Sequence, residues 1–336
     1  MLSEVKEANM NKVYWHLPGF CYFYKLNTTL IKLMKQYPEK FHEGYEIGSV
    51  YGTFPGAIWN GGRAVFGVMS KKDIKTVIDY YNSLGVPVRF TWTNSLLEEK
   101  HLNDTYCNLI MELANNGKNQ VLVNRDVLSD YLRKTYHSVS ENIKTSNESS
   151  NKNDAQNIYK NGYASYMDSF GSAKSGFAFI SSTTKRITDL GEVKKELEGD
   201  YALVVLDYDL NCDEAVLKEL EPYADRLEIL VDEICYPHCP KRKEHYADES
   251  LMQLTFDKDT RYECTNKMTR PSFAEAMKRP HFISNEKLPE YINRGYRNFK
   301  IVGRGLPQDM VLESYLYYLV KEADREFIKK KLTDVK

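Results

Sequence analysis

Apolar runs of strand length alternate with helix-like segments along most of this chain, and this alternation limits the folds that it can adopt. The strand candidates are residues 45–51, 86–92, 120–124, 177–181, 202–206, 227–231, 281–284 and 299–302. Strands that are apolar on both faces belong to parallel sheets covered by helices. This number of units favours a (β/α)8 TIM-like barrel, and an open doubly wound sheet is the alternative.

Capping signals and apolar periodicity mark the helices between these strands. Ser70 and Asp73 form an S-x-x-D capping pattern, Ile74 and Val77 begin an apolar stripe, and Gly85 ends it. Further helices are predicted over residues 102–113, 127–136, 189–197, 213–220, 285–293 and 308–328.

Two segments depart from this rhythm. Residues 137–176 are rich in Ser, Asn, Lys and Gly without a hydrophobic period, which predicts a partly disordered surface insertion. Residues 233–280 form an irregular excursion that holds several cysteines. The rest is expected to form a single barrel domain across residues 1–336.

Charge and hydropathy narrow the class of protein. With 46 basic and 47 acidic residues, the net charge argues against general binding to nucleic acid or to a membrane surface. No apolar run approaches the roughly 20 residues that cross a bilayer, and the polar N-terminus shows no signal peptide. Six cysteines in a chain of this length do not indicate a disulfide framework. We therefore expect a cytoplasmic protein.

Charged and amide side chains follow the predicted strands, where a barrel places its active site. Loops are polar in any protein, but a whole ring of such residues favours a site. The candidate acid–base residues are Asp207, Asp232, Glu233 and His245. The candidate substrate-binding residues are Arg63, Asn94, Lys185, Arg242 and Arg304.

A group of cysteines follows the strand at residues 227–231. Cys235 and Cys239 are spaced C-x3-C, and Cys264 is the natural third thiolate. Three thiolates with an open position would suit an iron–sulfur cluster, and closed tetrahedral ligation would suit zinc. The fourth ligand is left open, and so is the alternative that these are unrelated free cysteines.

Two arginines predict an anion site. Arg63 follows the first predicted strand through Gly61 and Gly62, and Arg304 follows the eighth. The first and last strands of a closed barrel are neighbours, so the two guanidiniums are expected to face one volume with free backbone N–H groups. The alternative is that Arg304 pairs with Asp207 or Glu233.

Two segments resemble the peptidase U32 superfamily. One is the strand that holds Glu228 and leads into the cysteines, and the other is Asn298-Phe-Lys-Ile-Val-Gly-Arg304 before a Tyr-rich helix. The resemblance is best over residues 200–320. It implies a TIM-barrel-like fold and either a peptidase or an iron–sulfur protein that supports oxygen-independent hydroxylation of RNA or quinone precursors. Cys264 alone matches the later paired cysteines of that family.

These observations predict a barrel enzyme with a Cys-ligated iron–sulfur cluster or zinc ion at its mouth, acting on a small or polymeric anionic substrate. The alternative from another class is a non-catalytic barrel that binds a glycan, peptide or nucleotide and holds a structural metal. A U32-type peptidase is a third possibility, although no G-x-S-x-G or H-E-x-x-H motif names a nucleophile or a zinc site.

Overall fold

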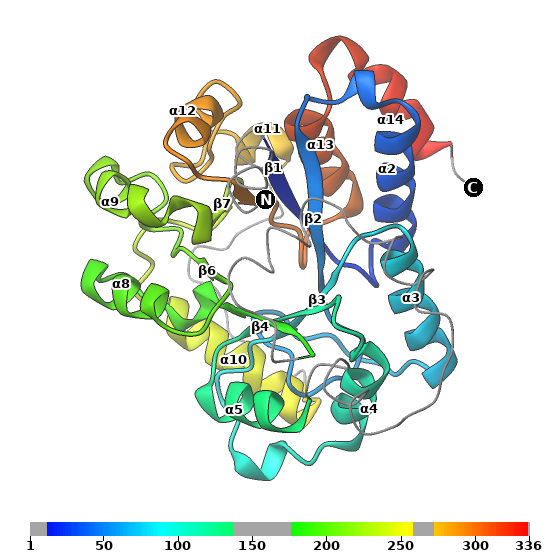
Figure 1. Ribbon diagram of the computed structural model, residues 1–336, viewed down its shortest axis with the longest axis vertical. Coiled ribbons are helices and arrows are strands. Elements are labelled where there is room, and N and C mark those ends of the chain that lie inside the picture. Colours follow the sequence, from blue (N-terminus) through cyan, green and yellow to red (C-terminus); the bar gives the residue numbers. More distant parts are fainter. Residues whose placement is uncertain (1–11, 137–175, 258–271, 335–336) are drawn as a thin grey trace, which may run out of the picture.

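The computed structural model describes residues 12–136, 176–257 and 272–334, which form a closed barrel (Figure 1). All eight strands are parallel and pair in chain order, and the eighth closes on the first. They are β1 Val13–Pro18, β2 Tyr45–Gly52, β3 Val88–Trp92, β4 Gln120–Val123, β5 Ala178–Ser181, β6 Leu203–Val205, β7 Leu227–Leu230 and β8 Asn298–Lys300. The predicted fold class is confirmed.

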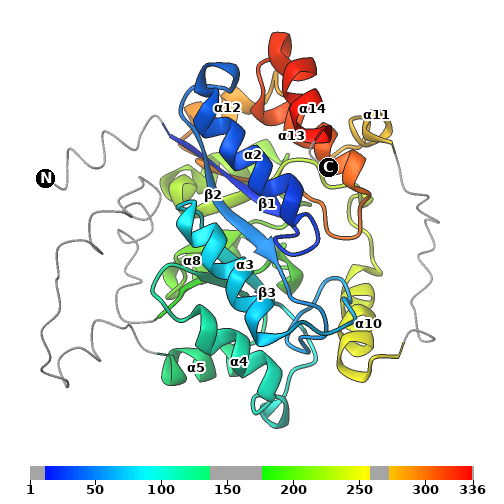
Figure 2. The ribbon, with the colours of Figure 1, turned by 90° about the vertical axis from the view of Figure 1, so that its right-hand side faces the viewer.

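Helices cover the outer wall of the barrel, as Figure 2 shows for α2 and α3 beside β1 to β3. They are α2 Tyr24–Gln36, α3 Lys71–Ser83, α4 Thr105–Ala114, α5 Asp126–Thr135, α8 Leu190–Glu198, α9 Glu214–Leu220, α10 Arg242–Thr255, α11 Phe273–Ala276, α12 Leu288–Asn293, α13 Gln308–Leu319 and α14 Arg325–Thr333. Ser70 caps α3 as predicted, because its Oγ accepts the Asp73 backbone N–H at 3.1 Å. Within the described ranges, no helix combines the length and apolar character needed to cross a membrane.

The predicted number of strands is right only because two errors cancel. The prediction misses β1, a fully buried strand that carries His16 and follows a polar stretch. It also assigns a strand to residues 281–284, where Phe282 forms just an isolated antiparallel bridge with Asp232. The true second strand is therefore the one at Tyr45–Gly52.

The helix predictions are wrong at both ends of the excursion and at the C-terminus. Residues 233–280 were expected to be irregular, but they contain α10 and α11. The buried face of α10 includes the polar residues Glu249, Ser250 and Gln253. The predicted helix over residues 308–328 is two helices, since Val320 bridges Phe41 and the chain leaves the helix there. The predicted insertion at 137–176 lies almost entirely outside the described residues.

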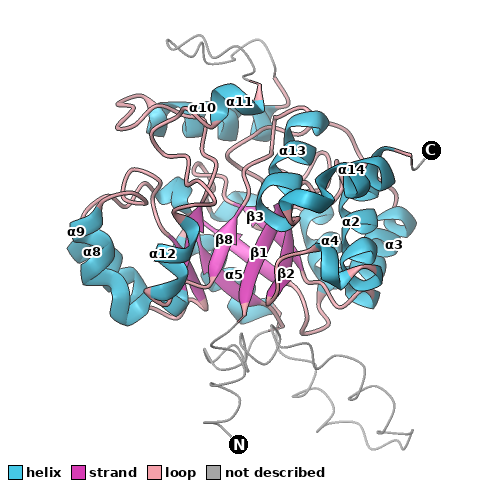
Figure 3. Cartoon of the chain, turned by 90° about the horizontal axis from the view of Figure 1, so that it is seen from above, coloured by secondary structure: helices cyan, strands magenta, loops and turns pink. Residues whose placement is uncertain are grey.

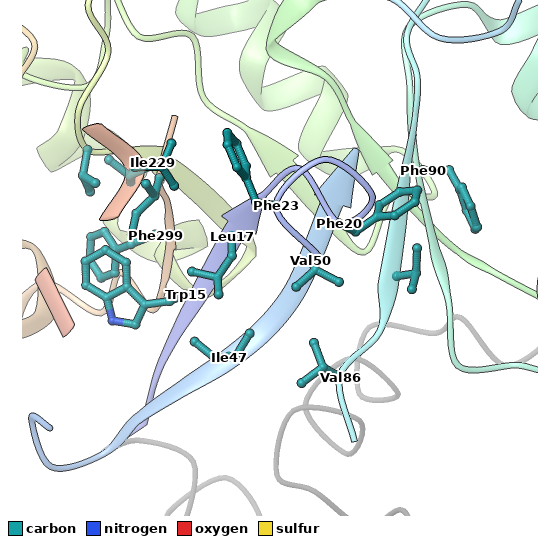
Figure 4. Close-up of a cluster of buried hydrophobic side chains, with 14 of the residues drawn as sticks. Trp15, Leu17, Phe20, Phe23, Ile47, Val50, Val86, Phe90, Ile229 and Phe299 are labelled. Carbon is teal, nitrogen blue, oxygen red and sulfur yellow. The ribbon is translucent and has the colours of Figure 1, made fainter. Parts of the chain in front are cut away.

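Side chains alternate in direction along each strand, so the buried residues form two separate hydrophobic cores. Trp15, Leu17 and Val50 belong to the layer between strands and helices (Figure 4). Tyr14 faces the barrel interior, where it lies in a smaller apolar cluster. The other buried members of that cluster are Leu122, Ile180, Ala202, Leu203, Val205 and Leu230.

Candidate functional site

Helix α10 lies across the mouth of the barrel, at the carboxyl ends of β2 and β3 (Figure 3). The Gln253 side chain accepts the Val65 backbone N–H at 2.6 Å. The Asn94 amide donates to the backbone carbonyl of Ser250 at 3.0 Å. Asn94, predicted to bind substrate, is thus fully buried and holds the helix to the end of β3.

The loop after β2 turns back over the end of β3. Asn60 donates to the carbonyl of Arg63 at 2.6 Å and accepts from the Thr91 hydroxyl at 2.8 Å. A Cβ at Gly61 would lie 2.2 Å from the carbonyl oxygen of Thr93, so this close approach requires glycine. The turn fixes Arg63 beside the mouth.

Arg304, just beyond β8, reaches into this loop. Its Nη1 donates to Asn60 Oδ1 at 3.1 Å, to the Gly61 carbonyl at 2.8 Å and to Thr91 Oγ1 at 3.2 Å. All three acceptors are neutral, and no described carboxylate lies within ion-pair distance of Arg304. The alternative, in which Arg304 pairs with Asp207 or Glu233, is therefore wrong.

Arg63 and Arg304 line one cavity of about 540 Å³. Burial lowers the pKa of Arg304, and the positive charge of nearby Arg63 lowers it further. Glu249 of α10 shares the cavity, 3.7 Å from Arg63 Nη1, and also accepts the Ala64 backbone N–H at 2.6 Å. The two arginines do not follow adjacent strands as predicted, because β1 lies between β8 and β2.

A second group of charged residues lies at the ends of β5 to β7, and we call it the β6–β7 cluster. Arg186 pairs with Asp207 at 2.7 Å and also with Asp209. Arg242 of α10 lies 3.5 Å from Glu233. Arginines thus offset the mutual repulsion of the carboxylates that follow these strands.

Tyr208 is at the centre of the β6–β7 cluster. Its ring lies 4.6 Å from the Arg186 guanidinium carbon, 5.2 Å from that of Arg242, and 5.2 Å from the ring of His281. The sequence prediction misses Tyr208, Arg186 and His281. Tyr208 lies between Asp207 and Asp209 at a strand end, which was an available signal, but nothing in the sequence links His281 to this site.

Several buried polar atoms in this cluster have no hydrogen-bond partner among the described residues. They are Asp207 Oδ2, Tyr208 Oη, Arg242 Nε and the ring nitrogen Nδ1 of His281. His281 Nε2 is 3.4 Å from Asp209. Burial, opposed by Arg186, raises the pKa of Asp207 to about 6. Unpartnered buried groups are costly, so their concentration here suggests a functional site.

Asp232 forms hydrogen bonds that connect neighbouring elements of the barrel. Its carboxylate accepts the Val302 backbone N–H at 2.7 Å and the Ser314 hydroxyl at 2.9 Å, joining β7 to β8 and α13. Burial raises its pKa to about 7. Both oxygens of Asp232 are thus engaged, whereas Oδ2 of Asp207 is not.

Lys185 and His245 also contact protein groups. Lys185 pairs with Glu196 of α8 and donates to the Tyr201 hydroxyl at 3.1 Å, which directs it toward the helix layer. His245 lies 3.4 Å from Glu249, one turn along α10. Lys185 is therefore held by protein groups at the helix layer rather than presented to a ligand at the mouth.

Two of the three thiols predicted to hold a metal lie in the described part of the chain. The structure describes Cys235, which is buried, and Cys239, which is half-buried, whereas Cys264 lies outside the described residues. Among the described residues, no three His, Cys, Asp or Glu side chains converge in a way that would hold a metal. The two described thiols do not fit a cluster or a zinc ion by themselves, because such sites use three or four protein ligands.

A buried charge network fills the barrel beneath the mouth. Arg89 pairs with Glu228, and Glu228 lies 3.3 Å from His16 and 3.4 Å from Lys300. Despite burial, the nearby cations lower the pKa of Glu228 to about 2, while burial lowers the pKa of Lys300 to about 8. The sequence prediction contains none of these as site residues, since charges within strands have no recognisable spacing.

No protein-family model and no curated protein matches this sequence. A search of solved structures finds the structure of the U32 peptidase Mk0906, with 12% sequence identity and a TM-score of 0.49. The alignment covers 88% of this chain and 94% of that chain. The barrel fold itself is established by the pairing of the eight parallel strands.

Proposed function

We propose that this chain is a barrel enzyme that binds the anionic group of its substrate between Arg63 and Arg304. The observation that carries the proposal is that both guanidiniums line one cavity at the mouth. Arg304 bonds to neutral acceptors, while the charge of Glu249 is offset by Arg63. A carboxylate or phosphate complements the positive charge that remains.

Asp207 of the β6–β7 cluster, which is not among the residues that line the cavity, is the proposed acid–base residue. Its Oδ2 atom is unpartnered within the described chain, and its pKa of about 6 allows both protonation states near neutral pH. Glu233 suits this role less well, because it accepts the backbone N–H groups of Ile234 and Cys235 and faces Arg242.

The anion site is tested by titrating the full chain with inorganic phosphate and with malonate in a calorimeter. Arg63→Lys and Arg304→Lys keep the charge but lose the planar fork, so each should weaken binding by about tenfold. Arg294→Lys is the control, since Arg294 precedes β8 at the opposite end of the barrel and pairs with Glu214 at 2.6 Å. Unchanged affinity in both mouth variants would overturn the proposal.

A further inference from the structure

The cavity at the mouth has two chemically different parts. Arg63, Arg304 and Glu249 line one part, and apolar groups line the other. The apolar lining includes Tyr22, Pro55, Val65, Phe66, Met252 and Leu306. Two arginines would suffice for an inorganic anion, so the apolar part implies a ligand with more than a charged group.

Aromatic side chains at the rim are more exposed than packing requires. Tyr22 is 79% exposed although it lines the cavity. Phe256, which ends α10, is 49% exposed, and its ring lies 6.3 Å from the ring of Phe66. Exposed apolar groups that gather at a concave site mark a binding surface rather than a core.

The charged part fixes the sign of one end of the ligand. Glu249 would repel an anion, but it lies 3.7 Å from Arg63 and 3.4 Å from His245 and accepts the Ala64 backbone N–H. Arg304 has neutral hydrogen-bond partners only, among the described residues. One acidic group on the ligand would therefore balance the net positive charge of this part of the cavity. At about 540 Å³, the cavity has the size of a small-molecule site.

We infer that the ligand is a small organic acid with an apolar body. Its acidic group lies between Arg63 and Arg304, and its body contacts Tyr22, Val65 and Phe66. This inference rests on the proposed function and adds the class of substrate to it.

The test compares acetate, naphthylacetate and naphthylacetamide, titrated into the full chain. Burial of the ring system should make naphthylacetate bind at least about tenfold more tightly than acetate. The neutral amide should bind about tenfold more weakly than the acid of the same shape. This series separates the two parts of the cavity.

Two variants locate the apolar body. Phe66→Ala and the more exposed Tyr22→Ala should each weaken naphthylacetate binding by about fivefold and leave acetate binding unchanged. Phe327→Ala is the control, because Phe327 is also an exposed aromatic residue, at 40%, but it belongs to α14 and packs on Tyr37. Its affinities should equal those of the unmodified protein.

The outcomes distinguish this inference from the proposed function. If acetate and naphthylacetate bind equally and both need Arg304, the apolar body is wrong and the anion site stands. If Tyr22→Ala and Phe66→Ala both leave naphthylacetate binding unchanged, the inference is also wrong. If the acid and the amide bind equally and Arg304→Lys has no effect, the proposed function itself fails.

Discussion

Arg304 Nη2 lies so close to Gly62 that a Cβ on that glycine would be 2.8 Å from it. Gly62 also has a φ of +75°, a conformation that glycine adopts without a steric penalty. The backbone of the loop after β2 and the guanidinium of Arg304, just beyond β8, therefore occupy adjoining space, and a single methyl group would separate them.

Gly62→Ala should weaken phosphate binding several-fold, because the added methyl group displaces Arg304. Gly117→Ala is a matched control, since Gly117 has a φ of +74° and open space around its would-be Cβ. Each variant should lose about 1 kcal/mol of unfolding free energy from backbone strain alone. Calorimetric titration together with urea denaturation checks this. Equal phosphate affinity in the two variants would contradict the role given to Gly62.

Tyr208→Phe should stabilise the protein by about 1 kcal/mol, because the buried hydroxyl that it removes has no oxygen or nitrogen partner in the described chain and faces only the weakly hydrogen-bonding Cys235 thiol. Tyr318→Phe should have the opposite effect. The Tyr318 hydroxyl donates to the carbonyl of Ile283 at 2.8 Å and lies 3.1 Å from that of Val231. Urea denaturation of both variants measures the difference. A destabilised Tyr208→Phe protein would mean that the hydroxyl has a partner in solution, such as bound water.

Lys300 should make stability depend on pH in the alkaline range. Its pKa is lowered from 10.5 to about 8 in the folded state, so the unfolded chain binds more protons between these values. The contribution of Lys300 to the unfolding free energy therefore rises with pH across this window, by up to about 3 kcal/mol. Lys300→Met should remove this rise, which is measured as the difference between the two proteins' stability–pH curves. The same substitution at exposed Lys72 should leave the curve unchanged.

The thiol hypothesis is checked by metal content. The sequence predicts that Cys264 completes a site with Cys235 and Cys239, so anaerobically purified protein should contain iron or zinc. Cys235→Ser and Cys264→Ser should each release the metal, whereas Cys107→Ala, which changes a buried thiol of α4, should retain it. Protein free of both metals after reconstitution would show that these thiols hold none.

The barrel was predictable because most of its strands, although some carry one buried polar residue, lie in largely apolar runs that alternate with helix-like segments. The prediction that Arg63 and Arg304 face one volume is right although the strands were assigned incorrectly. All carboxyl ends of a parallel barrel meet at the same mouth, so the two residues come together in either assignment. Helix α10 was not predictable, because the residues that it buries are largely polar and find their partners near Asn60 and Val65.

The pairings inside the mouth were equally beyond the sequence. Arg186 is as polar as any loop residue, and only the folded chain brings it to Asp207 and Asp209. His281 belongs to a segment with strand-like composition, yet it lies beside Tyr208. These contacts join residues that are far apart in the sequence, so no local spacing of residues predicts them.

The bridge that α10 makes across the mouth also sets an order of assembly. Gln253 and Val65 are separated by 188 residues in the chain, and Arg304 and Gly61 by 243. A nascent chain therefore has no complete cavity until β8 has been synthesised, even if its first strands have already collapsed. A ligand held by Arg304 would stabilise only the closed barrel, and so would select finished molecules over partly folded ones.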